Sequence, residues 1–420
     1  MDITKEISTK VFPFKEVSDA GINLNPQNFD FVYGFPFLEN LPEVENFKLN
    51  NIVTKDKIGI YIHIPFCNKI CNFCYFTKST NCSQYSIDKY IENLQLEFSS
   101  YSFGLNKPKI EYCYIGGGTP SLLNIKQIDY LFKYLYKYFD LSECKEITFE
   151  GCPSSLSLEK IKHLKTNGVN RISIGIQSFD QNLSFTMNRN HTKNDSINCI
   201  KNLHKVFDNK FNADFIYGYP LSNLGILKKD LEIINNLFIP SITMYQLWSK
   251  VCKILYSKND ISFKDIFEQK KLINEFATSN NYIQDKSDWF IKSEESKFHF
   301  QDFKWMGGDF MGLGQSSYAY INGFYYLNEK NSNLYSERIS KTGNSISRLK
   351  SLTNYEIDVR KLILGIKTFK EIKVKSSFLS EPRIKNLIDI GLLSSNNEMV
   401  FLSETGKLIP DNVSNYLSKL

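Results

Sequence analysis

A short apolar stretch followed at once by three cysteines limits what this chain can be. Residues Ile60–Ile64 alternate isoleucine with tyrosine and histidine, which is typical of a strand, and Cys67, Cys71 and Cys74 follow in a CxxxCxxC pattern. Three thiolates this close can bind three irons of a cubane iron–sulfur cluster, whereas such clusters ordinarily take four cysteines. The missing ligand leaves one iron open, as one position is open in catalytic zinc sites. The pattern therefore predicts a strand that ends at a reactive metal site.

A zinc site and a set of inert core cysteines both fit this spacing less well. A zinc site usually pairs CxxC units or adds histidines at a second spacing. Here Cys82 lies nearby but out of register, and His63 falls inside the predicted strand. Cysteines that are simply buried in a core do not need this spacing. A cluster with one open iron is therefore the favoured interpretation.

The composition limits the class of protein. A chain of 420 residues is long enough for two or three domains, or for one large α/β unit with an appendage. Hydrophobic residues make up 42% and charged residues 23%, as is usual for globular proteins. The formal charge of +6 is spread without a basic block, so nucleic-acid binding is not indicated. The charge is compatible with an acidic small substrate, such as a carboxylated tetrapyrrole or a nucleotide.

Cysteine usage and the N-terminus predict the compartment. The chain has nine cysteines, and those outside the CxxxCxxC pattern form no disulfide framework. They are Cys82, Cys113, Cys144, Cys152, Cys199 and Cys252. The first residues, MDITKEISTK, lack the layout of a signal peptide, and no apolar run is long enough to span a membrane. We therefore expect a cytoplasmic protein in a reducing compartment, working under anaerobic conditions because an open cluster is oxygen-sensitive.

From Lys57 onward, strand-like and helix-like segments alternate. The predicted strands are Gly59–Ile64, Ile110–Ile115, Glu146–Glu150, Arg171–Gly175, Ala213–Tyr217 and Ser241–Gln246. The predicted helices are Tyr85–Phe98, Ile125–Tyr138, Leu158–Thr166, Asp195–Val206 and Ile226–Leu237. This alternation predicts an α/β fold with a parallel sheet closed or partly closed into a barrel, with right-handed crossovers. The reactive site of such a barrel lies at the C-terminal ends of its strands.

Candidate site residues follow these strands. Three glycines, Gly116–Gly118, and Thr119 come after the second strand. Glycines let the backbone approach a ligand closely, although a tight turn would need them as well. The other candidates, in chain order, are Glu150, Gln177, Arg189 and Asp214. Each alone would more often be a helix cap or a surface ion pair, but together at one barrel mouth they suit a zwitterionic ligand.

The chain outside the barrel divides into three predicted parts. A polar leader, residues 1–55, carries the aromatic segment Phe29–Phe37 and either closes a pocket or follows the surface. The barrel core spans residues 56–250. Residues 251–345 form a linker and a substrate-covering region.

In that linker we expect helices and loops up to about residue 300. The glycine turn Gly307–Gln315 and the aromatic run Tyr318–Tyr326 follow, and they either cover a flat ligand or form a β-hairpin packed on the barrel. Residues 346–420 have the element order of a winged-helix module, with helices at Tyr355–Leu364 and Glu381–Ile390 and then a hairpin. Because a basic recognition helix is missing, we interpret this part as a lid or substrate-shaping domain.

Together the motifs resemble the HemN/HemW-type branch of the radical S-adenosylmethionine (SAM) superfamily. The matching segments are YIHIPFCNKICNFCYF, YIGGGTPSLL, TFEGCP, GVNRISIGIQSFD, ADFIYGYP and GDFMGLGQ. The branch contains oxygen-independent coproporphyrinogen III oxidase, heme chaperones, class C radical methyltransferases and anaerobic heme-degrading relatives. The resemblance implies a partial (β/α)6 TIM-like radical SAM barrel with an N-terminal extension and a C-terminal winged-helix-like domain. It also implies a 4Fe-4S cluster, one or two molecules of SAM, and a flavodoxin- or ferredoxin-type electron donor.

The resemblance further implies roles for individual residues. Cys67, Cys71 and Cys74 would hold the cluster. The residues implied to contact the cluster-bound SAM are Tyr61, Gly117, Gly118, Thr119, Glu150, Gln177, Arg189 and Asp214. A second SAM would lie near Gln246 and Gln315–Ser317. The family cleaves SAM reductively to a 5′-deoxyadenosyl radical that abstracts hydrogen, while the protein positions and shields the reactants.

One departure from the oxidase pattern bears on the reaction. The oxidases have a further cysteine two residues after the third ligand, where this chain has Phe76, and Glu150-Gly151 resembles the heme-degrading methyltransferases more than the Glu-x-Asp-Pro of the oxidases. The long leader also differs from the compact chaperones. We therefore expect radical C-methylation or a related alkyl transfer to an unsaturated tetrapyrrole, peptide or natural product.

Two alternatives stay open at this point. The first is oxidative decarboxylation of the coproporphyrinogen III oxidase type. The second is heme carriage without turnover, which would need an exposed His or Cys placed for axial ligation. His191, His204 and His299 are the candidates. Each of these histidines would more often be an ordinary surface or core residue.

Overall fold

The centre of the molecule is a sheet whose first six strands lie side by side in the order of the sequence. The computed structural model describes residues 12–25, 31–52, 57–248 and 261–420. The six strands are β1 (Lys57–Ile64), β2 (Lys109–Gly117), β3 (Glu146–Gly151), β4 (Arg171–Gln177), β5 (Phe211–Tyr217) and β6 (Ser241–Gln246). Each strand pairs in parallel with the next. The predicted parallel α/β sheet is therefore confirmed.

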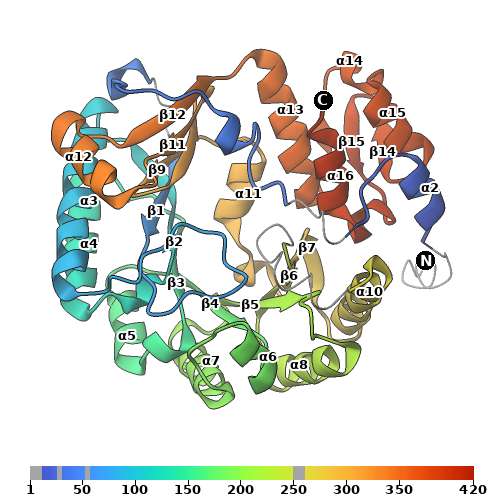
Figure 1. Ribbon diagram of the computed structural model, residues 1–420, viewed down its shortest axis with the longest axis horizontal. Coiled ribbons are helices and arrows are strands. Elements are labelled where there is room, and N and C mark those ends of the chain that lie inside the picture. The colour runs from blue at the N-terminus through green and yellow to red at the C-terminus, as the bar shows by residue number, and fades with distance from the viewer. Residues whose placement is uncertain (1–11, 26–30, 53–56, 249–260) are drawn as a thin grey trace.

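Helices connect these strands and cover one face of the sheet. They are α3 (Gln84–Gly104), α4 (Ile125–Tyr138), α5 (Leu158–Thr166), α6 (Gln181–Thr186), α7 (Lys193–Phe207) and α8 (Leu224–Asn236). Figure 1 shows them as an arc around the strands. In α4 the buried residues Ile128, Leu131, Phe132 and Leu135 recur at helical spacing, and a capping box at Asn124 begins the helix. The five predicted helices are confirmed, and the short α6 was not predicted.

Side chains along β1 alternate between the hydrophobic core and a cavity on the other face of the strand. Ile58, Ile60, Ile62 and Ile64 are fully buried in the main hydrophobic cluster. Tyr61, between them, lines the cavity instead. The period of two along a strand produces this division. One strand thus contributes both to packing and to the site.

Further strands extend the sheet at both edges. Next to β1 lie β9 (Phe310–Leu313), β10 (Tyr318–Ile321), β11 (Phe324–Asn328) and β12 (Ile346–Ser351), and next to β6 lie β8 (Trp289–Ile291) and β7 (Ile283–Lys286). β9 pairs in parallel with β1. β10 and β11 form a hairpin whose turn residues Asn322 and Gly323 both have positive φ, as a type I′ turn requires. In the described residues the sheet runs from β12 to β7 without closing.

The expectation for residues 251–300 was partly wrong. Helix α10 (Phe263–Ser279) and α11 (His299–Trp305) are present, but β7 and β8 form an unpredicted hairpin that pairs antiparallel with β6. Residues 249–260, including Cys252, lie outside the described residues. For the glycine and aromatic region the hairpin alternative is confirmed, and β10–β11 lies within the sheet. The linker therefore contributes strands to both edges of the sheet.

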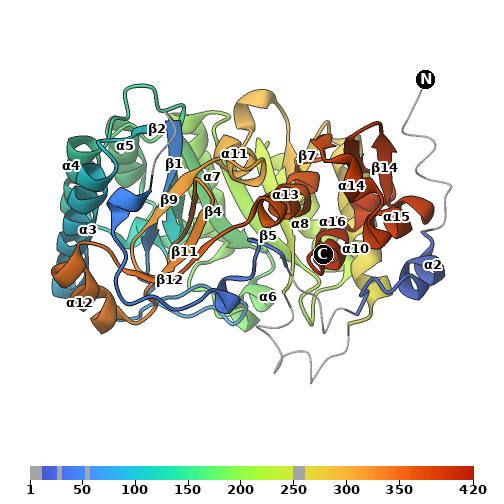
Figure 2. The same ribbon diagram turned by 90° about the horizontal axis from the view of Figure 1, so that it is seen from above.

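The C-terminal region contains the predicted helices and hairpin. These are α13 (Asn354–Gly365), α15 (Pro382–Asp389), β14 (Leu393–Asn396) and β15 (Met399–Leu402), together with β13 (Ile372–Lys373), α14 (Ser376–Leu379) and α16 (Pro410–Leu417). β13, β15 and β14 form a three-stranded sheet. Figure 2 shows this region at the end of the molecule opposite α3 and α4, with α2 (Phe14–Asp19) of the leader beside α15.

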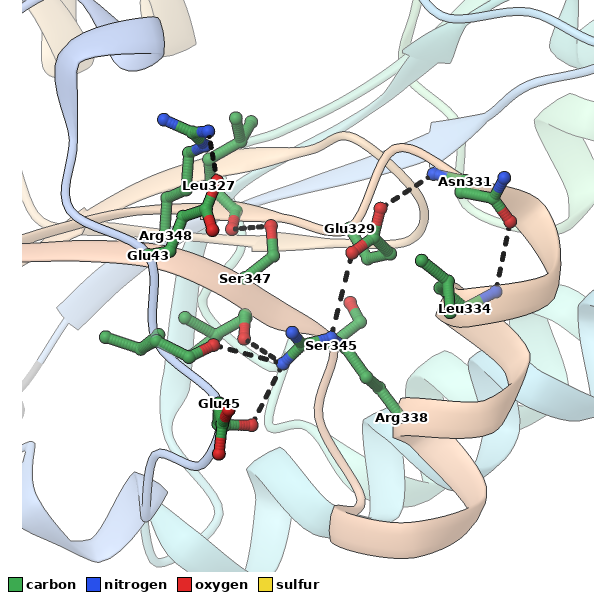
Figure 3. A network of polar contacts seen from close by, with 12 residues as sticks. Glu43, Glu45, Leu327, Glu329, Asn331, Leu334, Arg338, Ser345, Ser347 and Arg348 are labelled. Carbon is green, nitrogen blue, oxygen red and sulfur yellow. Dashed lines mark hydrogen bonds and ion pairs between the residues drawn. The ribbon is translucent and has the colours of Figure 1, made fainter.

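The leader is fastened to the edge of the sheet by two arginines. Arg348 of β12 donates to the carbonyl oxygens of Glu39 and Leu41 and to the Glu43 carboxylate at 2.6 Å. Arg338 of α12 (Ser332–Thr342) donates to the carbonyl oxygens of Val44 and Glu45. Figure 3 shows this network. No helix among the described residues is long and apolar enough to cross a membrane.

Candidate active site

The C-terminal ends of the barrel strands open into a cavity of about 440 Å³. This volume is typical of small-molecule sites. The predicted site residues that line it are Tyr61, Cys67, Cys71, Cys74, Gly117, Gly118, Thr119, Glu150, Gln177, Arg189, Asp214 and Gln246. They come from all six parallel strands and the loops after them. The structure thus brings together residues that are spread over about 190 positions of the chain.

Among the predicted site residues, Gly116, Ser317 and Gln315 do not line the cavity. The side chain of Gln315 lies elsewhere. It is buried, and its amide group bonds to the carbonyl oxygen of Lys330 and to the hydroxyl of Ser332. The next residue, Ser316, lines the cavity instead. Gly314 and Ser316 both have positive φ, so the backbone turns sharply at this point and directs the Gln315 side chain away.

The cysteine loop lies against the glycine turn that follows β2. Cys67 is buried, while Cys71 and Cys74 are half-buried, and all three are free thiols. A Cβ atom on Gly118 would come within 2.6 Å of the Phe66 carbonyl oxygen and 3.0 Å of Cys67 Sγ. Gly118 therefore has to be glycine for the two loops to approach this closely.

The surroundings of the thiols suit metal-bound thiolates. Arg189 Nη1 donates to Cys71 Sγ at 3.2 Å, Thr119 Oγ1 lies 3.6 Å from Cys67 Sγ, and Lys78 Nζ donates to the Cys74 carbonyl oxygen. Burial raises the pKa of the Cys67 thiol to about 11 and also raises that of Cys74. Metal binding reverses this effect because a coordinated thiol loses its proton.

The described residues contain no group of three His, Cys, Asp or Glu side chains gathered to hold a single metal ion. A zinc site needs its ligands around one ion. In a cubane cluster each thiolate binds a different iron, so three separated thiols on one loop fit that group.

Two carboxylates lie in the cavity without an ion-pair partner among the described residues. Glu150 accepts from Gly117 N at 2.9 Å and from the Tyr114 hydroxyl, and Asp214 accepts from Asn212 Nδ2 at 2.8 Å and Ser173 Oγ at 3.1 Å. Burial raises the pKa of Glu150 to about 7 and raises the pKa of Asp214 above its ordinary value. A cationic ligand would offset this desolvation. SAM, with a sulfonium and an ammonium group, has that chemistry.

Arg189 supplies a positive charge in the cavity, which complements the two carboxylates. Its Nη2 donates to the Gly175 carbonyl oxygen, while Nε has no hydrogen-bond partner among the described residues although it is shielded from solvent. A buried donor without a partner is costly unless a ligand satisfies it. The guanidinium is thus available for a carboxylate, as the sequence analysis expects for the methionine end of SAM.

A chain of hydrogen bonds connects β1 to the cysteine loop and to the turn after β9. The Tyr61 hydroxyl lies 3.0 Å from His63 Nδ1, His63 Nε2 lies 3.0 Å from the Thr77 carbonyl oxygen, and Thr77 Oγ1 donates to Ser316 Oγ at 2.7 Å. Burial lowers the pKa of His63 to about 4. The neutral ring therefore has one donor and one acceptor, and both nitrogens are in use. Sequence reasoning missed this role because His63 looks like a strand residue.

The cavity also has an aromatic wall, formed by Tyr33, Tyr75, Trp248 and Tyr318. The ring centroids of Tyr75 and Trp248 are 4.5 Å apart, and Tyr33 lies 6.0 to 6.2 Å from the other three rings. Phe76 stacks on Tyr75 at 4.3 Å and is 46% exposed. These residues come from the leader, the cysteine loop, the end of β6 and β10. Tyr33 and Tyr318 belong to aromatic segments that the sequence analysis names, whereas Tyr75 and Trp248 were not predicted to join them.

The candidate histidines do not face the cavity. His191 is buried with Nδ1 3.5 Å from Cys152 Sγ, and His204 bonds to the Leu237 carbonyl oxygen between α7 and α8. His299 begins α11, where its backbone N–H donates to Glu146. None of the three is among the residues that line the cavity. Cys152 does line it, and the sequence analysis assigned Cys152 no role.

Comparison with known proteins agrees with this geometry. The family model "Radical SAM superfamily" matches residues 61–232. The chain is 30% identical over 373 residues to the heme chaperone HemW of Buchnera aphidicola subsp. Acyrthosiphon pisum, covering 84% of this chain and 96% of the relative. It is 27% identical over 325 residues to oxygen-independent coproporphyrinogen III oxidase of Escherichia coli K12, covering 74% of this chain and 71% of the relative.

A solved structure shares the whole fold. The structure described as coproporphyrinogen III oxidase (HemN) from Escherichia coli, a radical SAM enzyme, superposes with a TM-score of 0.82, covering 93% of this chain and 99% of that chain at 20% identity. The cofactors of this family are a 4Fe-4S cluster and SAM. Cys67, Cys71 and Cys74 would hold the cluster. The chain therefore belongs to the radical SAM superfamily, in the branch that contains HemW and oxygen-independent coproporphyrinogen III oxidase.

Proposed function

We propose that this chain is a catalytic radical SAM enzyme that modifies a flat, unsaturated substrate of the tetrapyrrole class. One observation carries the proposal: the cysteine loop, the two carboxylates, Arg189 and the aromatic wall line a single cavity. Aromatic rings stack on flat conjugated molecules. The wall therefore offers a binding surface next to the position where SAM would be cleaved.

The polar residues would bind and orient SAM. Arg189 would pair with its carboxylate in a charge-assisted bond. The glycine turn at Gly117 and Gly118 allows close approach of the backbone, and Glu150 and Asp214 would accept from ribose hydroxyls or the ammonium group. The bound cluster supplies the electron for reductive cleavage, and the protein excludes water from the reacting atoms.

A catalytic role is better supported than heme carriage. A carrier with histidine ligation needs an accessible imidazole in the cavity. His63 lines the cavity but both of its nitrogens are engaged. The carboxylates and Arg189 would also have no purpose in a site that binds heme alone. The names of the relatives, a heme chaperone and a coproporphyrinogen oxidase, support a tetrapyrrole as the substrate class.

For the reaction we propose methyl transfer from a second SAM. Gln246, expected to contact that molecule, lies in the cavity, and Phe76 occupies the position of the additional oxidase cysteine at the mouth. The second candidate is oxidative decarboxylation, which the curated oxidases favour by name. The two reactions differ in what becomes of SAM, so product analysis separates them.

The test is an anaerobic assay of the reconstituted protein with SAM, a reductant and coproporphyrinogen III or heme, analysed by mass spectrometry. Formation of 5′-deoxyadenosine together with S-adenosylhomocysteine supports methyl transfer. 5′-Deoxyadenosine with loss of carbon dioxide from the substrate supports decarboxylation. Stoichiometric heme uptake without SAM cleavage would overturn the catalytic proposal. Cys71→Ala is the control in which neither product should form.

A further inference from the structure

One cation of the cavity, Lys304, lies beside its aromatic wall and makes no ion pair with a described residue. Lys304, in the last turn of α11, lines the cavity. In the described part of the chain, no carboxylate oxygen lies within 4.0 Å of its ammonium group, and Lys304 makes none of the ion pairs found there. Glu150, in the same cavity, interacts with Lys304 electrostatically over a longer distance. A cation near the C-terminus of a helix is favourable in itself. That effect explains a cation at this position but not a side chain turned into a cavity.

A carboxylate is available on the same helix, but Lys304 does not pair with it. Asp302, two residues earlier, pairs with Lys286 at 2.9 Å and Lys370 at 3.1 Å, and lies 4.0 Å from Lys297. Residues two apart on a helix do not share a face. Asp302 therefore faces a cluster of lysines on one side of α11, while Lys304 faces the cavity on another.

Aromatic rings hold the Lys304 ammonium in place. Nζ lies 5.4 Å from the ring centroid of Phe300, 5.2 Å from that of Phe310 and 5.2 Å from that of Tyr318. Such contacts stabilise a cation without neutralising its charge. They also restrict the flexible side chain, so that little rotamer entropy is left to lose when a ligand binds. The ammonium is thus preorganised and still carries its full charge.

The position of the ammonium relates it to the aromatic wall. Tyr318 belongs to that wall, and its ring lies 6.0 Å from that of Tyr33 as well as beside Lys304. Arg189, by contrast, contacts Cys71 in the cysteine loop. The cavity therefore has Arg189 at the expected SAM position and Lys304 beside the surface proposed for the flat substrate, while Lys69, Lys78 and Lys330 line it as well.

We propose that Lys304 binds a carboxylate of the acceptor substrate, so that this enzyme selects flat substrates that carry an acidic side chain. The inference rests on the proposed function, since it concerns the same cavity. A lysine ammonium bonds a carboxylate as a compact point charge with three donors. A bond of this kind with a charged group corresponds to roughly a tenfold to hundredfold change in affinity.

The test compares two probes, coproporphyrin III and its tetramethyl ester, by fluorescence titration of the anaerobically reconstituted protein. Lys304→Met removes the charge at similar length, and Lys304→Arg keeps it. Lys126→Met is the matched control, because Lys126 also lies over an aromatic ring, Tyr130 at 5.7 Å, but on the outer surface of α4. SAM affinity is measured on each variant by equilibrium dialysis.

We expect Lys304→Met to bind coproporphyrin III at least about tenfold more weakly than the wild type. Its affinity for the ester should match that of the wild type, and Lys304→Arg and Lys126→Met should retain the preference for the acid. Equal weakening toward acid and ester would mean that Lys304 only packs against the rings, and would overturn the proposal. A loss of SAM affinity with unchanged porphyrin binding would assign the carboxylate to SAM and overturn it as well. If the wild type binds neither porphyrin, the proposed substrate class fails and this inference falls with it.

Discussion

The ammonium of Lys367 lies 2.5 Å from Oδ1 of Asp411, and both side chains are buried. Lys367 Nζ also donates to the Val32 carbonyl oxygen at 3.2 Å and lies 3.8 Å from the ring centroid of Phe31. Phe31 lines the cavity. One buried lysine thus connects the leader, the C-terminal region and the wall of the active site.

Replacing this lysine should be costly, because it leaves the Asp411 carboxylate buried without its partner. We expect Lys367→Met to lower the free energy of unfolding by about 3–5 kcal/mol. The double variant Lys367→Met with Asp411→Leu should recover much of that loss, since neither charge is then buried. Urea denaturation measures both effects. Lys407→Met, which breaks the exposed pair with Glu404, is the control and should cost no more than about 1 kcal/mol. Similar losses for both lysines would contradict the prediction.

The cluster assignment predicts a sharp difference between neighbouring cysteines. Cys71→Ala should lose most of the iron and all SAM cleavage, because it removes one of three thiolate ligands. Cys82→Ala should retain both, since the half-buried Cys82 does not line the cavity. Iron and sulfide analysis of the reconstituted proteins, with an assay for 5′-deoxyadenosine, checks this. Full iron content in Cys71→Ala would refute the ligand assignment.

Much of the barrel and most of the site were predictable because their signals are local. The isoleucines of β1 and the cysteines after it are contiguous. Each further strand is an apolar run with a distinctive residue in it or in the loop after it, such as Glu150 in β3 or Asp214 in β5. Parallel strands bring those loops to one edge of the sheet. Residues that recur at intervals along the sequence therefore lie together in the folded protein.

The missed features depend on contacts between distant segments. β7 and β8 have four and three residues, too few for a period to be recognised. The direction of the Gln315 side chain depends on the positive φ angles beside it. Tyr33 and Trp248 meet only after the leader has folded against the barrel. Sequence patterns carry none of this information.

Asp214 should contribute directly to SAM binding. Asp214→Asn keeps the shape and removes the charge that would face a cationic ligand, although one of the two oxygens that accept from Asn212 and Ser173 becomes an amide donor. We expect SAM to bind about tenfold to hundredfold more weakly, the range for a hydrogen bond with a charged group. Equilibrium dialysis with the reconstituted protein measures the dissociation constant. The exposed Asp129→Asn is the control, and equal affinities for both variants would exclude a role for Asp214.

The aromatic wall should affect the acceptor and not SAM. Trp248→Leu removes a ring that lies 4.5 Å from Tyr75. Because an aromatic pair is worth about 0.5–1.5 kcal/mol beyond its buried area, we expect the KM for a tetrapyrrole acceptor to rise roughly threefold to tenfold or more. SAM cleavage without acceptor should be unchanged. The exposed Tyr130→Leu on α4 is the control. An unchanged KM for the acceptor would argue against binding at this wall.

Glu97 should make the stability of the protein depend on pH. Its fully buried carboxyl accepts from Gly314 N at 2.7 Å and from the Tyr335 hydroxyl at 2.9 Å, and burial raises its pKa to about 7. The folded protein thus keeps this proton up to about pH 7, whereas the unfolded chain loses it near the ordinary pKa of 4.5. The folded state binds more protons in that window, so its stability falls as the pH rises through it and levels off above about pH 7.

The difference between the two pKa values corresponds to a loss of folding free energy on the order of 3 kcal/mol across this pH window. Glu97→Gln removes the titration, so its free energy of unfolding relative to the wild type should rise by this amount between about pH 4.5 and pH 8. Urea denaturation at both pH values measures the difference, and contributions from other buried acids cancel because both proteins contain them. Glu92→Gln, exposed on the same helix, should follow the wild type. If the free energies of unfolding of Glu97→Gln and the wild type changed equally with pH, the buried carboxyl would not titrate in this range.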